Sequence, residues 1–144
     1  PGTEHFRNVA RHQVISDPRR VLIRIDENLY FANADAVRDF VLAAVDQNPR
    51  AKAVVLVMTS VSYIDSSGLE MLEALDADLQ AQSVALHLAE VKGPVADRLG
   101  RARLWQTLAP ARIHLSTADA VAALGGEADG DGAAPLRQAA EKPR

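Results

Sequence analysis

The stretch AKAVVLVMTSVSYIDSSGLEMLEALDADLQAQ, residues 51–82, contains the most apolar run of the chain and the change of pattern that follows it. An uninterrupted apolar run is typical of a central strand that is covered on both faces. Apolar residues then recur at three- and four-residue spacing, which predicts a helix from about Ser66 to Gln82. Its inward stripe is Leu69, Leu72, Leu75 and Leu79. A polar turn, Asp65 to Gly68, lies where the strand gives way to this helix.

Strand and helix patterns alternate along the rest of the chain. Strands are predicted at QVIS (a short edge strand, residues 13–16), VLIRIDE (21–27), VALHLAE (84–90) and ARIHLS (111–116). Further helices are predicted at residues 33–48, 94–104 and 118–124. Helices of this length can connect parallel strands as crossovers. The predicted fold class is therefore α/β, with a mixed, mostly parallel sheet of four to five strands and about four helices.

A chain of 144 residues is most simply one domain. We expect residues 1–12 to be an entry linker, residues 13–124 to form the domain, and residues 125–144 to be a disordered tail, because the last segment is rich in Gly, Ala and charge. The first residue is Pro1, from which we expect a piece cut from a longer protein.

The composition excludes several classes of function. The net charge of −3 argues against a nucleic-acid-binding protein, which normally presents a basic face. Without cysteine there is no disulfide, thiolate nucleophile or Cys-ligated zinc. The run AVVLVM is far shorter than the ~20 residues that a membrane helix needs. The four histidines are scattered without metal-ligand spacing, so no metal and no cofactor are expected, and His87 and His114 are interpreted as structural.

The turn Asp65, Ser66, Ser67 and Gly68 is the main candidate for a functional site. Functional residues of α/β folds gather at the carboxyl ends of parallel strands, where this turn is expected. Free N–H groups at a helix start favour an anion, so a phosphate on Ser66 or Ser67 would be stabilised there and would change what docks. Gly68 would let a partner or kinase approach the backbone closely. The alternative is that Ser and Asp merely cap the helix.

YIDSSGLEMLEALDADL, following an apolar strand, resembles the signature loop and helix of STAS domains, and the resemblance covers about residues 1–124. STAS domains are the fold of anti-sigma-factor antagonists and of the cytoplasmic tails of SulP-type anion transporters. The resemblance implies that Ser66 or Ser67 matches the serine that a partner kinase phosphorylates in the antagonists. Glu70 departs from their loop, in which a glycine or small residue usually follows.

Three further stretches resemble the transporter branch, namely PGTEHFRNV, RVLIRIDENLYFANADAVRDFV and LHLAEVKGPVADRL. The implied function is that of a non-catalytic regulatory domain at the cytoplasmic face of the inner membrane, as part of a sulfate-type permease. Its implied partners are the transporter's own membrane domain, a dimer mate, a regulatory protein or kinase, and a nucleotide. The alternative is a stand-alone anti-sigma-factor antagonist that is switched by serine phosphorylation.

A second strand-to-helix turn contains Lys92 and Gly93, which we expect on the same edge of the sheet as Ser66. Lys92 could contact a nucleotide or another anion, or the turn could be only a surface turn, since no Walker or GxGxxG motif is present. A receiver-like reading would make Asp65 a phospho-acceptor with Lys92 and an acidic pair, Asp26 and Glu27. The Ser-Ser-Gly that follows Asp65 argues against this chemistry.

The predicted helix at residues 66–82 carries acidic residues away from its leucine stripe, and its own sequence has no Lys or Arg to balance them. These residues are Glu70, Glu73, Asp76 and Asp78. Such a face is by default a solvated surface. Its unbalanced charge also predicts a docking face for a basic partner, with Glu70, Glu73 and Asp76 as the partner-facing residues.

Overall fold

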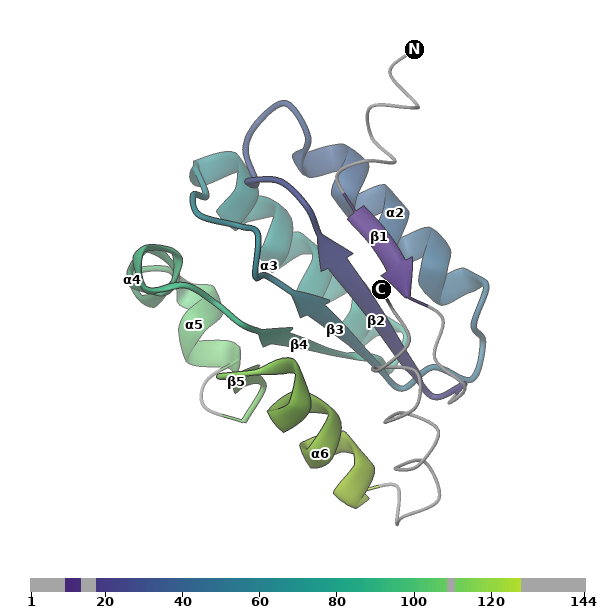
Figure 1. Ribbon diagram of the computed structural model, residues 1–144. Helices are drawn as coiled ribbons and strands as arrows, with labels where there is room; N and C mark the ends of the chain where they lie inside the picture. Colours follow the sequence, from purple (N-terminus) through teal and green to yellow (C-terminus); the bar gives the residue numbers. More distant parts are fainter. Residues whose placement is uncertain (1–9, 14–17, 109–110, 128–144) are drawn as a thin grey trace.

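The computed structural model describes residues 10–13, 18–108 and 111–127, and Figure 1 traces their path. The strands are β1 (Ala10–Gln13), β2 (Arg20–Ile25), β3 (Ala53–Val57), β4 (Ala85–Ala89) and β5 (Ile113–His114). The helices are α2 (Ala34–Asp46), α3 (Ser66–Ala81), α4 (Gly93–Gly100), α5 (Arg103–Leu108) and α6 (Thr117–Glu127). No helix among these described residues is long and apolar enough to cross a membrane.

The strands form one sheet in the order β1-β2-β3-β4-β5, in which β1 is antiparallel to β2 and the remaining pairs are parallel. The predicted fold class is confirmed. Two details differ from the prediction. The edge strand lies at residues 10–13 rather than 13–16, of which 14–16 are outside the described residues. The third predicted helix, residues 94–104, is divided into α4 and α5 by a bend at Arg101 and Ala102.

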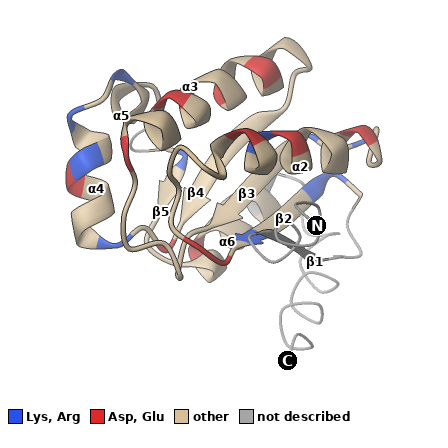
Figure 2. Ribbon diagram, turned by 90° about the horizontal axis from the view of Figure 1, so that it is seen from above, with Lys and Arg blue, Asp and Glu red and all other residues tan. Residues whose placement is uncertain are grey.

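Helices cover both faces of the sheet, as Figure 2 shows, with α2 and α3 on one side and α6 on the other. Successive side chains of β3 point to opposite faces of the sheet, and both faces are covered, which explains its continuous apolar sequence. Val54 and Leu56 belong to the large core beneath α2 and α3, whereas Ala53 and Val55 belong to the smaller core beneath α6. Leu72, Leu75 and Leu79 of the predicted stripe are fully buried, and Leu69 is half-buried.

The expected domain boundaries fall close to the ends of the described chain. Residues 10–12, which we expected in the entry linker, lie in β1 of the sheet. Helix α6 continues to Glu127, beyond the expected end of the domain at residue 124. Residues 1–9 and 128–144 lie outside the described residues, so the linker and the tail stay predictions.

Candidate functional site

The turn before α3 lies beside the connection from β2 to α2. Leu29 and Ile64 form an isolated parallel bridge, and the Leu29 carbonyl accepts the Asp65 N–H at 3.1 Å. The Asn28 side chain adds to this pairing, because its Oδ1 accepts the N–H groups of Ser62 and Tyr63 at 2.7 and 3.1 Å. Two connections at the carboxyl edge of the sheet are thus held together as one unit.

Asp65 is the N-cap of α3. Its Oδ1 accepts the Gly68 N–H at 2.9 Å, and its Oδ2 accepts the Phe31 N–H at 3.0 Å. Both carboxylate oxygens therefore bind backbone groups, one at the helix start and one on the neighbouring connection. This use of the side chain favours a structural role for Asp65 over the receiver-like one.

Ser66 and Ser67 occupy the first two helical positions, so the cap is the aspartate and not the serine pair. Ser66 is exposed and Ser67 is half-buried. The early N–H groups of a helix have no intrahelical acceptor, so a serine oxygen could accept from them. Within the described part of the chain, however, neither hydroxyl makes a hydrogen bond. The first turn of α3 therefore presents Ser66 to solvent at the carboxyl edge of the sheet.

Gly68 is buried, which contradicts the expectation that it leaves room for a partner or kinase. A Cβ at this position would lie 2.7 Å from Ile64 Cγ1 and 2.9 Å from the Leu29 carbonyl oxygen. The missing side chain instead allows the first turn of α3 to pack against the bridge between Leu29 and Ile64.

Lys92 reaches the same edge of the sheet, as expected, because its Nζ donates to Ser62 Oγ at 3.2 Å. Lys92 and Gly93 are both exposed, and Lys92 is the residue before α4. A groove of about 530 Å³ lies next to Ser62. It is lined by Asp26, Glu27, Asn28, Tyr30, Ser60, Ser62 and Tyr63. The carboxylates in this lining disfavour a phosphate in the groove.

The acidic face of α3 is only partly free. Glu70 and Glu73 are exposed, but Asp76 is 6% exposed, so its assignment to a partner-facing surface is wrong. Asp76 Oδ1 accepts from Arg112 Nη1 at 3.4 Å. Asp78 pairs with Arg38, whose Nε donates to Asp78 Oδ2 at 2.8 Å.

The arginines that balance this face lie outside the sequence of α3. Arg38 comes from α2 and Arg112 precedes β5, so a search for charges within the helix alone does not find them. Of the three residues that were predicted to face a partner, Glu70 and Glu73 are exposed.

His87 and His114 are brought together by the neighbouring strands β4 and β5. His87 Nδ1 lies 3.0 Å from His114 Nε2, and the rings stack with centroids 5.2 Å apart. Burial, together with the nearby His114 and Arg112, lowers the pKa of His87 to about 4, and burial is the largest of these causes. No group of three possible metal ligands occurs among the described residues.

Two exposed aromatic side chains lie on the connections that meet at the turn, a feature that the sequence pattern did not predict. Phe31 is 76% exposed and Tyr63 is 53% exposed. Tyr30 packs edge-to-face on Phe31 with ring centroids 5.6 Å apart. The Phe31 N–H is bonded to the Asp65 side chain, so the connection that carries Tyr30 and Phe31 is attached to the N-cap of α3. Apolar side chains that are exposed together on a surface make it a candidate docking site.

Comparisons with known proteins agree with the resemblance seen in the sequence. The family model described as STAS domain matches residues 9–120. A probable sulfate transporter, 3.4, of Arabidopsis thaliana is 31% identical over 134 residues, which is 86% of this chain and 20% of the relative. The chain thus spans about a fifth of the curated relatives it matches.

Two solved structures share the fold. The murine Solute Carrier 26 family member A9 anion transporter in the inward-facing state aligns with a TM-score of 0.70 at 18% identity, covering 89% of this chain and 24% of the transporter. The anti-sigma factor antagonist SpoIIAA in its unphosphorylated form aligns with a TM-score of 0.59 at 14% identity, covering 81% of this chain and 98% of SpoIIAA. The fold is therefore shared with a part of an anion transporter and with nearly all of an anti-sigma factor antagonist.

Proposed function

This chain belongs to the STAS domain family, and from that premise we propose that it is the regulatory, non-catalytic STAS domain of a SulP-type anion transporter. It would lie on the cytoplasmic face of the inner membrane, in contact with the transporter's membrane domain and a dimer mate. The sequence similarity to sulfate transporters supports this assignment, as does the fraction of their length that the match covers.

The observation that carries the regulatory role is the exposed aromatic pair beside the turn before α3. Phe31 and Tyr63 stand on two connections that are joined by the Leu29–Ile64 bridge. Hydrogen bonds fix the backbone of both connections before a partner arrives, so that binding orders only the side chains and loses less entropy. These aromatics are the proposed contact with the membrane domain or with a regulatory protein, and the exposed Glu70 and Glu73 would add charge toward a basic partner.

Phosphorylation of Ser66 or Ser67 is the proposed control of this contact. Ser66 is the more accessible of the two hydroxyls. A phosphate there would add nearly two negative charges at a helix start, next to Asp65 and close to Phe31. Binding of a nucleotide at Lys92 and Gly93 is a weaker proposal, because Asp26 and Glu27 line the adjacent groove.

A transport assay tests the proposed contact. The complete gene product would be reconstituted in vesicles, and uptake of labelled sulfate would be compared between wild type and the double variant Phe31→Ala, Tyr63→Ala. Uptake should fall while the domain stays folded, because both side chains are exposed. Leu115→Ala is the matched control, since Leu115 is 91% exposed and lies directly after β5. Equal uptake by all three proteins would contradict a role for the aromatic pair.

The second candidate is a stand-alone anti-sigma-factor antagonist, which the likeness to SpoIIAA over nearly all of that protein favours. The gene sequence upstream of Pro1 separates the two, since many apolar spans there would establish the transporter. For the switch itself, the chain would be incubated with the cognate kinase and ATP, with Ser66→Ala and Ser67→Ala as paired variants. If neither the wild type nor either variant takes up phosphate, the result contradicts the proposed phosphorylation.

A further inference from the structure

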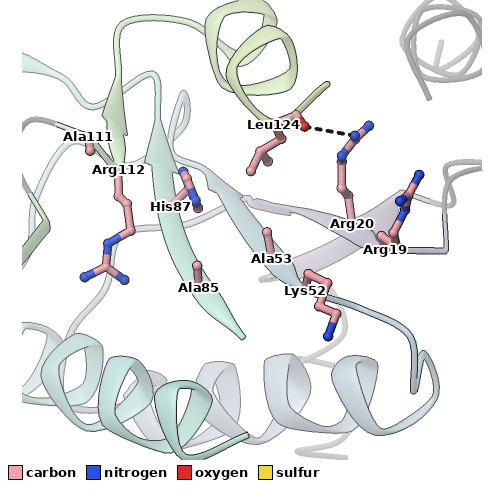
Figure 3. Close-up of a pocket in the computed structure, with 9 residues that line it drawn as sticks. All are labelled: Arg19, Arg20, Lys52, Ala53, Ala85, His87, Ala111, Arg112 and Leu124. Atoms are coloured by element: carbon pink, nitrogen blue, oxygen red, sulfur yellow. Dashed lines mark hydrogen bonds between the residues drawn. The ribbon is translucent and has the colours of Figure 1, made fainter. Parts of the chain in front are cut away.

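Helix α6 has little apolar contact with the face of the sheet that it covers. A helix of 11 residues is marginal in water by itself, so α6 depends on its contacts with the rest of the chain. Near its C-terminal end the packing is incomplete, because Leu124, Ala53 and Ala85 line a cavity of about 370 Å³, drawn in Figure 3. The apolar contact is the smaller of the two cores, which consists of Leu22, Ala53, Val55, Ala89, Ala120 and Leu124.

Side chains from outside the helix hold α6 at both of its ends. At its start, Glu90 Oε2 accepts the Thr117 N–H at 2.9 Å and the Thr117 hydroxyl at 3.1 Å. Near its other end, Arg20 Nη2 donates to the Leu124 carbonyl at 3.0 Å, the dashed line in Figure 3. Hydrogen bonds to charged groups are stronger than those between neutral ones, and a carboxylate at a helix start also interacts favourably with the helix dipole. Polar contacts therefore supply much of what fixes this helix.

Glu90 makes its contacts from an unusual backbone conformation. Its φ is 63°, in the left-handed region that residues with a side chain seldom adopt. Such a conformation costs free energy and persists where the surrounding contacts hold it. Here these contacts are the carboxylate bonds to Thr117 and the bond from the Glu90 N–H to the His114 carbonyl at 3.2 Å. The backbone at Glu90 and the docking of α6 therefore stabilise each other.

Glu90 also belongs to the carboxyl edge of the sheet. It follows β4 directly, and Lys92, two residues later, donates to Ser62 on the connection that leads to α3. The link from β5 to α6 is only Leu115 and Ser116, and Leu115 is 91% exposed. A rotation at this link would not disturb any packing of the Leu115 side chain. Helix α6 is thus attached to the carboxyl edge by one carboxylate and to β5 by a short, exposed link.

We propose that the Glu90 carboxylate is a latch that keeps α6 on the sheet, and that α6 opens as a unit when this latch is released. Opening would uncover Val55 and the rest of the smaller core, while the larger core beneath α2 and α3 stays closed. Segments with few buried apolar contacts are those that open separately from the whole protein. A partner that binds at the carboxyl edge and displaces Glu90 would release α6 on another face. The latch depends only on contacts within the chain, so it holds for a transporter domain and for a stand-alone antagonist alike.

Cysteine labelling tests the opening, because the chain has no cysteine of its own. Val54→Cys and Val55→Cys are a matched pair, since both residues are fully buried neighbours on β3. Val55 belongs to the core beneath α6, and Val54 to the core beneath α2 and α3. Under native conditions a thiol reagent should modify Val55→Cys faster than Val54→Cys, and urea unfolding of both variants corrects the rates for any difference in global stability. Equal corrected rates would overturn the separate opening of α6.

Glu90→Ala, added to Val55→Cys, tests the latch and imitates its release. Alanine keeps the cost of the positive φ and removes the carboxylate, so labelling should become at least about tenfold faster. Glu90→Gln keeps an acceptor oxygen without the charge, and its labelling rate should lie between the two. If Glu90→Ala left the labelling of Val55→Cys unchanged, the carboxylate would not be the latch.

Val41→Ala is the control for a general loss of stability, because Val41 is fully buried in α2 within the larger core. It should speed the labelling of Val54→Cys, which needs the larger core to open. It should not speed the labelling of Val55→Cys, because the contacts of Val41 stay intact while α6 is open. Faster labelling of Val55→Cys in Val41→Ala, to the same extent as in Glu90→Ala, would overturn the proposal.

Discussion

Replacing Gly68 by alanine would place a methyl group where the first turn of α3 meets the neighbouring connection. The new Cβ would lie 2.7 Å from Ile64 Cγ1, 2.9 Å from the Leu29 carbonyl oxygen and 3.1 Å from Leu29 Cβ. Favourable contacts between carbon atoms lie at about 3.5–4.0 Å. Leu29 is fully buried, and its carbonyl already accepts the Asp65 N–H, so neither neighbour can move without disturbing the bridge.

The expected change in the free energy of unfolding is a balance of two terms. Overpacking of this kind costs about 3 kcal/mol, at the upper end of its usual range, because one of the close contacts is to backbone. Alanine is favoured over glycine in a helix by about 1 kcal/mol. Gly68→Ala should therefore be less stable by about 2 kcal/mol, which lowers the melting temperature by roughly 6 °C in a domain of this size.

Urea unfolding followed by circular dichroism, together with calorimetry, measures this change. Gly100→Ala is the matched control, because Gly100 ends α4 and a Cβ there would have no neighbour within 4 Å. The control should gain about 0.5 kcal/mol from the reduced freedom of its unfolded chain. If Gly68→Ala were as stable as Gly100→Ala, the packing explanation for Gly68 would be refuted.

The remaining predictions concern three side chains. Asp65→Ala should lose about 1–2 kcal/mol, since it removes an N-cap and a bond to a second connection, and amide exchange at Gly68 should become faster. Because the folded state keeps His87 neutral, with its pKa lowered from 6.5 to about 4, the unfolded chain takes up this proton first as pH falls, and stability should decline between those values. Since a difference of one pKa unit corresponds to about 1.36 kcal/mol, the loss in the free energy of unfolding is at most about 3 to 4 kcal/mol. Urea unfolding of His87→Gln across this pH range should lack that part of the decline. Asp76→Ala should lower the free energy of unfolding by about 2 kcal/mol, because Arg112 stays behind without its counter-charge. Glu73→Ala, at an exposed position of the same helix, should stay within about 0.5 kcal/mol of wild type. A similar loss in both variants would contradict the separate roles given to these two residues.

The sequence predicts most of the fold because its periodicity is strong. The apolar run of β3 predicts a strand, and the leucine spacing of α3 predicts a helix. Together they place the turn at residues 65–68 at the carboxyl edge of the sheet. Spacing along one helix does not reveal partners elsewhere in the chain. Asp76 was therefore assigned to the surface, although Arg112, brought close by β5, covers it.

Other features of the two edges depend on contacts between distant segments. The burial of Gly68 follows from Leu29, which lies on the connection from β2 to α2 and is far from Gly68 in the sequence. The cavity at the amino edge of the sheet, whose lining is drawn in Figure 3, includes Arg20, Lys52 and Arg112. The sequence held a usable signal for their meeting, because a basic residue directly precedes β3 and β5 and another begins β2. Once the strands are taken as parallel, such residues must share the amino edge.

The sheet ends in short strands on both sides, with Ala10–Gln13 at one margin and Ile113–His114 at the other. In the described part of the chain, a visiting strand would find few unpaired backbone groups at either margin. Brief edge strands protect β proteins from aggregation by sheet extension. Self-association of this domain, and its assembly into a larger protein, should therefore rely on side-chain surfaces of the helices and connections, and the sheet should stay closed to fibril growth at high concentration.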